Sequence, residues 1–290
     1  MVLLHVKRGD EGLFLVQASV GDPVEDVLGN TVTLHNGRLK VHRICQGMEQ
    51  LADHGYTLPP EMHGLTSDQI VDLKLKDEHE HTCIPSSGYI QNSDPCGRRC
   101  GRQPVEKMRE VLHKTIKEAK AMISKELLGS GTPLTEQHLY DTLEMLRGAV
   151  TIVYPMGLPV YDPIRQELEN REDLTGTQDL KMVMDAGMTQ LWFAGKEMQC
   201  GKKLIDYFGR NEKSKVVVKL QKRGDGAPGR EPALTEEQRR TLMAAEFRRR
   251  EELKKLEECD DDVHLDSPWA DNHQLHRSFQ GLNNISWKPH

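Results

Sequence analysis

The sequence predicts an α+β fold: a split β-grasp (ubiquitin-like) sheet with large helical insertions, a projecting C-terminal helix and an extended tail. Three observations support this prediction. Two apolar runs separated by a turn open the chain, two more apolar, β-branched runs lie at residues 149–154 and 215–220, and most of the remaining sequence has helical periodicity. An isolated hairpin is only marginally stable, so the two distant strands are expected to complete its sheet.

The first element expected is a β-hairpin of residues 2–7 and 13–18, with residues 8–12 as the turn between its strands. Asp22 then caps a helix that has Pro23 at its first position. A hairpin followed by a helix is the opening of a β-grasp.

Two helices are expected in the segment that follows this cap. Apolar side chains recur at helical spacing up to His35, and Asn36-Gly37 predicts a break. A second helix is expected from about Arg38 to Asp53, and Gly55 ends it.

The segment after this helix is expected to consist mainly of loops. One short helix, capped by Ser67, is expected between residues 58 and 77. Residues 79–102 are rich in Ser, Gly, Pro and charge, which predicts a mobile surface loop.

This loop also holds the metal-like cluster of the sequence, formed by His79, His81, Cys83, Cys96 and Cys100. Zinc needs four nitrogen or sulfur ligands. The spacing between Cys96 and Cys100 suits such a site, whereas His81 and Cys83 are close together for two ligands. We therefore expect no bound metal here.

The strongest helical pattern runs from Pro104 to Leu128, with one apolar stripe. A glycine-rich turn and a cap at Thr135 predict a second, antiparallel helix after it. That helix leads into the predicted strand Ala149–Tyr154. Pro155 ends the strand because proline has no N–H to donate to a sheet.

Prolines dominate the loop that follows, residues 155–164, and fix its backbone in an extended form. The simpler interpretation is a rigid connection. The alternative is a binding loop, whose candidate partner-binding residues are Tyr154, Met156, Leu158 and Tyr161.

Two helices and a strand are expected next. Asp162-Pro163 opens a short helix, and Thr175 or Thr177 caps a longer one with a methionine-rich face that extends to Met198. Lys215–Leu220 is the next strand, and its flanking lysines suit an edge position.

The chain is expected to divide into an α+β body of residues 1–232, a charged helix of residues 233–260 and a tail of residues 261–290. Thr235 and Gln238 form a capping box for the helix, expected from about Glu236 to Glu258, which is either solvated or packed on a partner helix. Unfolded tails rarely carry aromatic residues. The tail is therefore expected to dock on the body or on a partner through Trp269, Phe279 and Trp287.

Composition limits the classes of function. With 290 residues, 37% of them hydrophobic and 29% charged, and a net charge of -6, the chain is an unlikely partner for nucleic acid. No apolar run reaches the length of a membrane span, and the apolar N-terminus is too short for a signal peptide. The six scattered cysteines are expected to be reduced thiols in the cytoplasm.

Catalytic motifs find no support in the sequence. It has no Ser-His-Asp order, no phosphate-binding Walker motif and no GxGxxG. Residues 224–229 resemble a phosphate loop in glycine content alone. We therefore expect no enzymatic activity and no cofactor.

Several long strings of the sequence resemble one known family. These strings are Met1–Asp10, Arg147–Val150, Ile152–Pro159, Asp162–Ile164, Gly226–Pro228, Asp260–Asp262 and Ser267–Asn272. Together they resemble, essentially from end to end, the Kurly family of cilia- and flagella-associated proteins. That family has no known catalytic residues to transfer to this sequence.

The resemblance implies a non-enzymatic adaptor or assembly factor for motile cilia, which supports outer dynein arm assembly and cilium motility. It also implies links to cilium positioning and planar cell polarity, and a cytoplasmic location with cilium and basal body association. Its partners would be proteins, namely dynein-arm assembly factors or chaperone adaptors. The alternative is a structural component bound to the axoneme or the basal body.

The tail provides the first testable prediction. Deleting residues 261–290 is expected to leave the body folded and to weaken partner binding, because buried aromatic side chains dominate the energetics of interfaces. Thermal unfolding and partner capture would be compared between the deleted and the full-length chain. A sharp fall in melting temperature would instead place the aromatic side chains in the protein's own core, and no change in either measurement would make the tail a passive extension.

Overall fold

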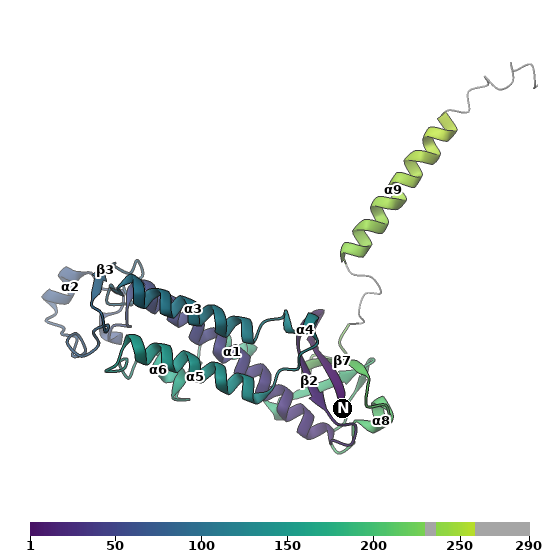
Figure 1. Ribbon diagram of the computed structural model, residues 1–290, viewed down its shortest axis with the longest axis horizontal. Coiled ribbons are helices and arrows are strands. Elements are labelled where there is room, and N and C mark those ends of the chain that lie inside the picture. The colour runs from purple at the N-terminus through teal and green to yellow at the C-terminus, as the bar shows by residue number, and fades with distance from the viewer. Residues whose placement is uncertain (230–235, 259–290) are drawn as a thin grey trace, which may run out of the picture. The chain divides into compact units, whose positions relative to one another are not determined.

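The computed structural model describes residues 1–229 and 236–258 (Figure 1). The chain divides into two compact units, residues 1–230 and residues 231–290. The first unit contains the sheet and all described helices except α9 (Glu236–Glu258), which belongs to the second.

The first unit contains a five-stranded sheet with the strand order β2-β1-β7-β5-β6. Its strands are β1 (Val2–Arg8), β2 (Glu11–Ala18), β5 (Thr189–Phe193), β6 (Lys196–Glu197) and β7 (Lys215–Lys222). β1 is antiparallel to β2 and parallel to β7, and β5 is antiparallel to both β7 and β6. β1 thus forms an N-terminal hairpin with β2, which α1 (Val24–His54) follows, and it pairs in parallel with β7 on its other side. The α+β fold expected from the sequence is confirmed.

The place of β7 in this sheet differs from the expectation. Lys215–Leu220 was expected at an edge, but β7 pairs with β1 on one side and with β5 on the other. The lysine inside this strand, Lys219, is only 8% exposed. Its Nζ donates a hydrogen bond to the carbonyl of Gly229 (2.8 Å) and lies 3.8 Å from Asp10 Oδ1. Because its ammonium group has partners, this lysine does not require an edge.

The predicted strand Ala149–Tyr154 is wrong. These residues form the last turns of helix α5 (Glu136–Val153) and its C-cap, Tyr154. Ala149, Val150 and Val153 are buried whereas Ile152 is 57% exposed, which is helical spacing. Packing therefore overrides the strand preference of β-branched residues, and the helix continues until Pro155 disfavours helical geometry at Tyr154.

The strand that completes the sheet lies instead in the segment where a long helix was expected after Thr175 or Thr177. Only the short α7 (Asp179–Met182) and a 3-10 turn, η2 (Ala186–Met188), precede β5. Ala194 and Gly195 both have positive φ, 47° and 78°, and connect β5 to β6. Two successive positive φ angles are typical of a tight hairpin turn, which the methionine-rich helical spacing concealed.

Asn36-Gly37 lies inside a single helix, α1 (Val24–His54), rather than between two. The Asn36 side chain pairs with the backbone of Met184 in both directions, with distances of 2.7 and 3.0 Å. A Cβ atom at Gly37 would lie 2.6 Å from Leu139 Cδ1, so the glycine allows α5 to approach closely. The dipeptide therefore serves packing instead of a turn.

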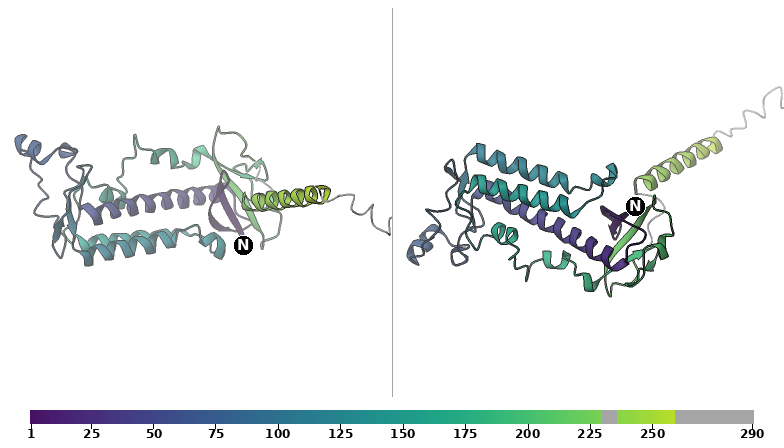
Figure 2. Two further views of the ribbon diagram at one scale, coloured as in Figure 1. Left: turned by 90° about the horizontal axis from the view of Figure 1, so that it is seen from above. Right: turned by 60° about the horizontal axis from the view of Figure 1, so that its bottom comes forward.

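Two long helices lie alongside α1, as the views in Figures 1 and 2 show: α3 (Glu106–Met122) and α5. The predicted helix pair is thus present, although α3 ends at Met122 and not at Leu128, and Thr135 caps α5 as expected. The buried Arg38 donates to Ile123 O at the end of α3 and to Leu13 O in β2, which ties the helices to the sheet.

Short elements complete the described residues. Helix α2 is capped by Thr66, not by Ser67. In the expected loop of residues 79–102, β3 forms a two-stranded ribbon with β4, which begins at the last residue of that loop. The bounds of the short elements are η1 (Pro60–Met62), α2 (Ser67–Asp72), β3 (Tyr89–Gln91), β4 (Arg102–Pro104), α4 (Leu127–Ser130), α6 (Pro163–Leu168) and α8 (Ile205–Phe208). The ribbon and α2 lie at the end of the first unit that is remote from the sheet (Figure 1).

Gly55 provides a test of how tightly α1 ends. Its φ of 78° and ψ of -164° lie in a region that glycine almost alone occupies, and a Cβ atom would lie 2.5 Å from Arg102 O. We expect Gly55→Ala to lower the free energy of unfolding by about 2 kcal/mol or more, as measured by urea denaturation. The control is Gly29→Ala within α1, where a Cβ atom meets nothing within 4 Å. This control should raise the free energy of unfolding by at most about 1 kcal/mol. Equal losses of stability in both variants would contradict the argument.

Candidate functional site

The loop between α5 and α6, residues 155–161, is held at its start and in its middle by buried side chains. Tyr154 is 1% exposed at its start, and Leu158 is 4% exposed in its middle. Gly157 has a φ of 82° and donates its N–H to Tyr154 O (2.9 Å). The loop is therefore a defined structure rather than a loose connection.

Asp162 is the main anchor of this loop. Its carboxylate is fully buried, and Oδ1 accepts the N–H of Ile164 (2.9 Å) as the cap of α6. Oδ2 accepts the N–H of Thr57 (3.0 Å), in the segment after α1. One side chain thus joins the loop, α6 and the end of α1.

Arg99 supplies a buried positive charge beside this anchor. It is 8% exposed and donates from Nη1 to Gly55 O (2.7 Å). Burial lowers the pKa of Arg99, and the negative charge of Asp162 opposes that change. Each buried charge therefore lies near an opposite charge or within hydrogen-bonding distance of polar groups, as burial of ions requires.

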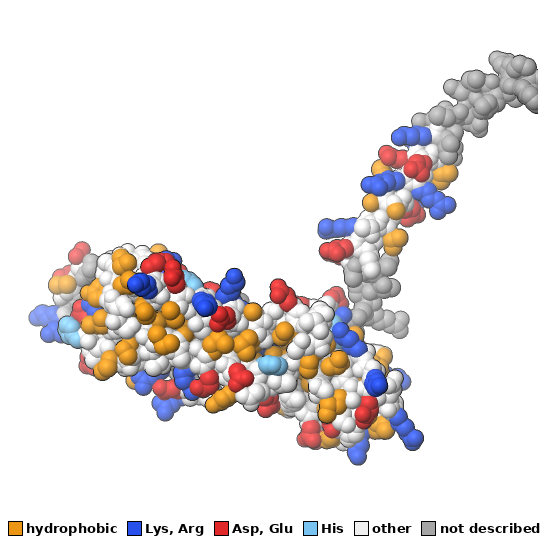
Figure 3. Space-filling view, viewed as in Figure 1, with side chains coloured by type: hydrophobic (Ala, Val, Ile, Leu, Met, Phe, Trp, Pro, Cys, Tyr) orange, Lys and Arg blue, Asp and Glu red, His pale blue; other side chains and the backbone are white. Residues whose placement is uncertain are grey.

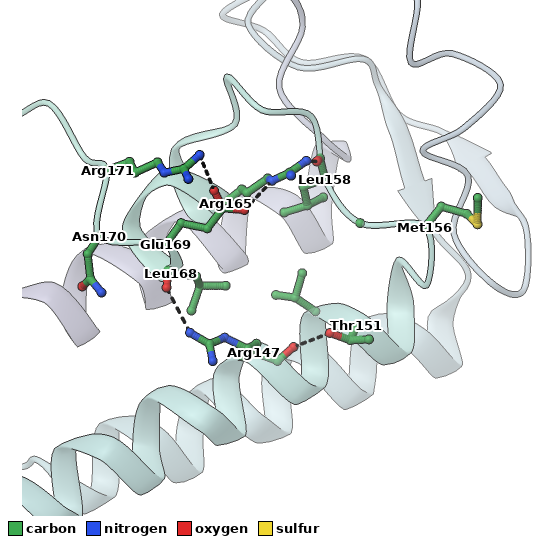
Figure 4. A pocket seen from close by; sticks show the side chains of 11 residues that line it. Arg147, Thr151, Met156, Leu158, Arg165, Leu168, Glu169, Asn170 and Arg171 are labelled. Atoms are coloured by element: carbon green, nitrogen blue, oxygen red, sulfur yellow. Dashed lines mark hydrogen bonds and ion pairs between the residues drawn. The ribbon is translucent and has the colours of Figure 1, made fainter.

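A hollow of about 610 Å³ lies between this loop, α5 and α6 (Figure 4). Its walls combine apolar and charged side chains. Arg165, Glu169 and Arg171 lie on one wall, and Arg147 lies on the facing wall, which α5 forms. Val150, Leu158 and Leu168 supply apolar surface between them.

Hydrogen bonds hold the charged side chains of the hollow in place. Arg165 donates to Glu169 Oε1 and to Leu158 O, both at 2.8 Å, and Arg147 donates to Leu168 O at 3.0 Å. Arg171 Nη1 lies 3.3 Å from Glu169 Oε2. The hydrogen bond from Arg165, together with the charges of both arginines, lowers the pKa of Glu169.

Exposed apolar side chains lie in the loop and in the last turn of α5. Met156 is 77% exposed, Val160 58% and Ile152 57%. Apolar side chains also gather over the middle of the visible face of the helical part of the body, with charged side chains mostly toward its margins (Figure 3). Exposed apolar groups beside a rigid backbone are typical of protein-interaction sites.

The four candidate loop residues have different environments. Met156 is exposed at the hollow and Leu158 lines its wall. Tyr154 is buried in the core, and no described residue forms a hydrogen bond with its hydroxyl. Tyr161 is half-buried, with its ring edge-on to His79 and its hydroxyl 3.5 Å from Asp77. The tail candidates Trp269, Phe279 and Trp287 lie outside the described residues.

The cysteine side chains of the metal-like cluster lie in different environments. Cys83 is buried and donates to Gly157 O, Cys96 is exposed, and burial raises the pKa of Cys100 to about 11. Among residues 1–229 and 236–258, no group of three or more His, Cys, Asp or Glu side chains is placed to hold a metal ion.

Sequence reasoning missed Arg147, Arg165 and Arg171, because they are distant in sequence from each other or lie on separate elements. One signal was present, since Arg165 and Glu169 have the i,i+4 spacing of an ion pair on the helix that Asp162-Pro163 predicts. The described helices include none with the length and apolar character needed to cross a bilayer.

Comparison with known proteins gives a consistent result. The family model of cilia- and flagella-associated protein 298 matches residues 189–285. Proteins named cilia- and flagella-associated protein 298 from Danio rerio and Homo sapiens are each 55% identical over 289 residues, covering 100% of both chains. The protein of that name from Drosophila melanogaster is 50% identical over 288 residues, covering 99% of both chains. No solved structure matches the chain.

The anchoring role of Asp162 can be tested directly. Asp162→Ala removes a helix cap and leaves the buried Thr57 N–H without an acceptor, so we expect it to cost about 3 kcal/mol of unfolding free energy. Asp206→Ala is the control, because Asp206 also accepts a backbone N–H, from Lys203, but at an exposed position. Denaturation measures both variants, and faster hydrogen exchange at Thr57 is expected for Asp162→Ala alone. Equal stability of the two variants would contradict this role.

Proposed function

The chain belongs to the family of cilia- and flagella-associated protein 298, and from this premise we propose that it is a non-enzymatic adaptor or assembly factor of motile cilia. The similarity to these relatives along the whole chain is the observation that carries the proposal. It supports a role connected with the cilium.

The finer role proposed is support of outer dynein arm assembly, and with it cilium motility, cilium positioning and planar cell polarity. The proposed location is the cytoplasm, with association to the cilium and the basal body. The proposed partners are dynein-arm assembly factors or chaperone adaptors. These statements rest on the resemblance to the Kurly family.

The chemistry of the hollow supports an adaptor over an enzyme. Its described lining contains neither His nor Cys, and its one carboxylate, Glu169, is engaged by Arg165 and Arg171. Catalysis of proton transfer or nucleophilic attack requires a group that is free to change its protonation or to attack. The rigid loop, exposed Met156 and fixed arginines suit the docking of a protein instead.

The alternative role is a structural component of the axoneme or basal body. Detergent extraction of ciliated cells distinguishes the two roles. An assembly factor is expected in the detergent-soluble cytoplasmic fraction, and a structural component in the microtubule pellet.

Replacement in ciliated cells that lack their own relative tests the proposal. The intact chain is expected to restore outer dynein arms in electron micrographs, together with beating. Ile152→Glu combined with Met156→Glu should reduce the restored beating severalfold, because charges at the centre of an interface weaken docking.

The matched control for these changes is Val71→Glu, a substitution at a 74% exposed apolar residue of α2. It is expected to restore beating as the intact chain does. Failure of the intact chain to restore dynein arms would reject the assembly role, and full activity of the double variant would reject the loop as the docking site.

A further inference from the structure

We propose that the hollow between α5 and α6 binds a short acidic segment of a protein partner, with a carboxylate of that segment between Arg147 and Arg171. This inference rests on the proposed adaptor function and adds the chemistry of the partner. It is carried by the charges of the lining residues and by the way in which their guanidinium groups are held.

Positive charge exceeds negative charge at the hollow: there are three arginines against two carboxylates when Glu144, the partner of Arg147 at 2.6 Å, is counted with Glu169. Arg147, Arg165 and Arg171 face one lining carboxylate, that of Glu169. Both oxygens of this carboxylate are already engaged, Oε1 by Arg165 at 2.8 Å and Oε2 by Arg171 at 3.3 Å. An incoming carboxylate would therefore meet excess positive charge, which favours an acidic partner over a basic one.

Backbone carbonyls help to position two of the arginines, which also contact carboxylates: Arg147 Nη1 donates to Glu144 (2.6 Å) and Arg165 Nε to Glu169 (2.8 Å). Arg147 donates from Nη2 to Leu168 O, and Arg165 donates from Nη1 to Leu158 O. A carbonyl oxygen orients a guanidinium without cancelling its net charge. The positive charges are therefore pre-organised, which lowers the entropy cost of binding.

The guanidinium groups retain donors for a ligand. Each arginine has five N–H donors in a planar fork that matches a carboxylate. Arg147 uses Nη1 for Glu144 and Nη2 for Leu168 O, and the Arg171 side chain remains 73% exposed. Two-pronged pairing with a carboxylate is thus available on both walls.

Apolar surface beside these donors defines the rest of the partner segment. Val150, Leu158 and Leu168 line the hollow, and Met156 is exposed at its margin. A segment with an apolar residue close to an acidic one fits both features. A nucleic acid phosphate backbone would satisfy the arginines alone, and the net charge of -6 opposes a polyanion.

Random dodecapeptides displayed on phage and selected on the full-length protein test the proposal. The enriched peptides are expected to contain Asp or Glu next to Leu, Ile, Met or Phe. A fluorescein-labelled copy of the most enriched peptide then gives a dissociation constant by fluorescence anisotropy. Arg171→Glu and Arg147→Glu should each weaken binding about tenfold or more, and added salt should weaken it further.

Arg210→Glu is the matched control, because Arg210 is an exposed arginine elsewhere in the same unit. It should change the dissociation constant less than about twofold. Arg171→Glu is paired with a peptide in which Glu is replaced by Lys, and this charge exchange should restore binding. Circular dichroism would check that each variant is folded. Among the described residues, Arg171 forms one ion pair that the substitution would remove.

Three outcomes would overturn the inference: enrichment of no acidic peptide, unchanged binding by Arg171→Glu, or no restoration by the charge exchange. A labelled oligothymidylate is measured in parallel, and its preferential, arginine-dependent binding would assign the hollow to nucleic acid instead. The measurement uses the purified chain. Its failure is therefore distinct from failure of the proposed cilium role, which the cell experiment tests.

Discussion

The length of α1 is the constraint on which the first unit depends. Its 31 residues extend about 46 Å at 1.5 Å per residue, whereas the eight residues of β7 span about 26 Å. A sheet of such strands covers only part of the helix, yet buried side chains recur from Val24 to Ala52. The remainder has to be covered by other elements, and α3, α5 and α6, inserted between β2 and β5, supply that cover.

The proline loop takes its position from this cover. α5 packs on α1, and the chain leaves α5 near the segment that follows the end of α1. The Asp162 carboxylate then accepts a hydrogen bond from the N–H of Thr57 in that segment. The absence of a side chain at Gly47 leaves room for Ile164. The hollow beside the loop is therefore a consequence of helix packing, and its walls are as rigid as the helices that form them.

Arginine has two related uses in this unit. Arg38 and Arg99 are buried. Arg38 donates to carbonyls at the end of α3 and in β2, and Arg99 donates to carbonyls of Gly47 in α1 and of its C-cap Gly55, so their side chains hold the structure together. Desolvation lowers the pKa of both, but arginine does not lose its proton in proteins, so both stay charged. At the hollow, Arg147 and Arg165 also donate to backbone carbonyls but remain accessible, so they are candidates for binding a partner.

The sequence by itself determined the features that depend on local chemistry. These are the N-terminal hairpin, the caps at Thr135 and Asp162, the end of α1 at Gly55, and helix α9. Tertiary structure decided whether residues 149–154 were strand or helix and which segment completed the sheet, because an apolar run takes the form that buries it best. It also decided the hollow, since its arginines meet only when α5 and α6 pack together, and no local pattern encodes that meeting.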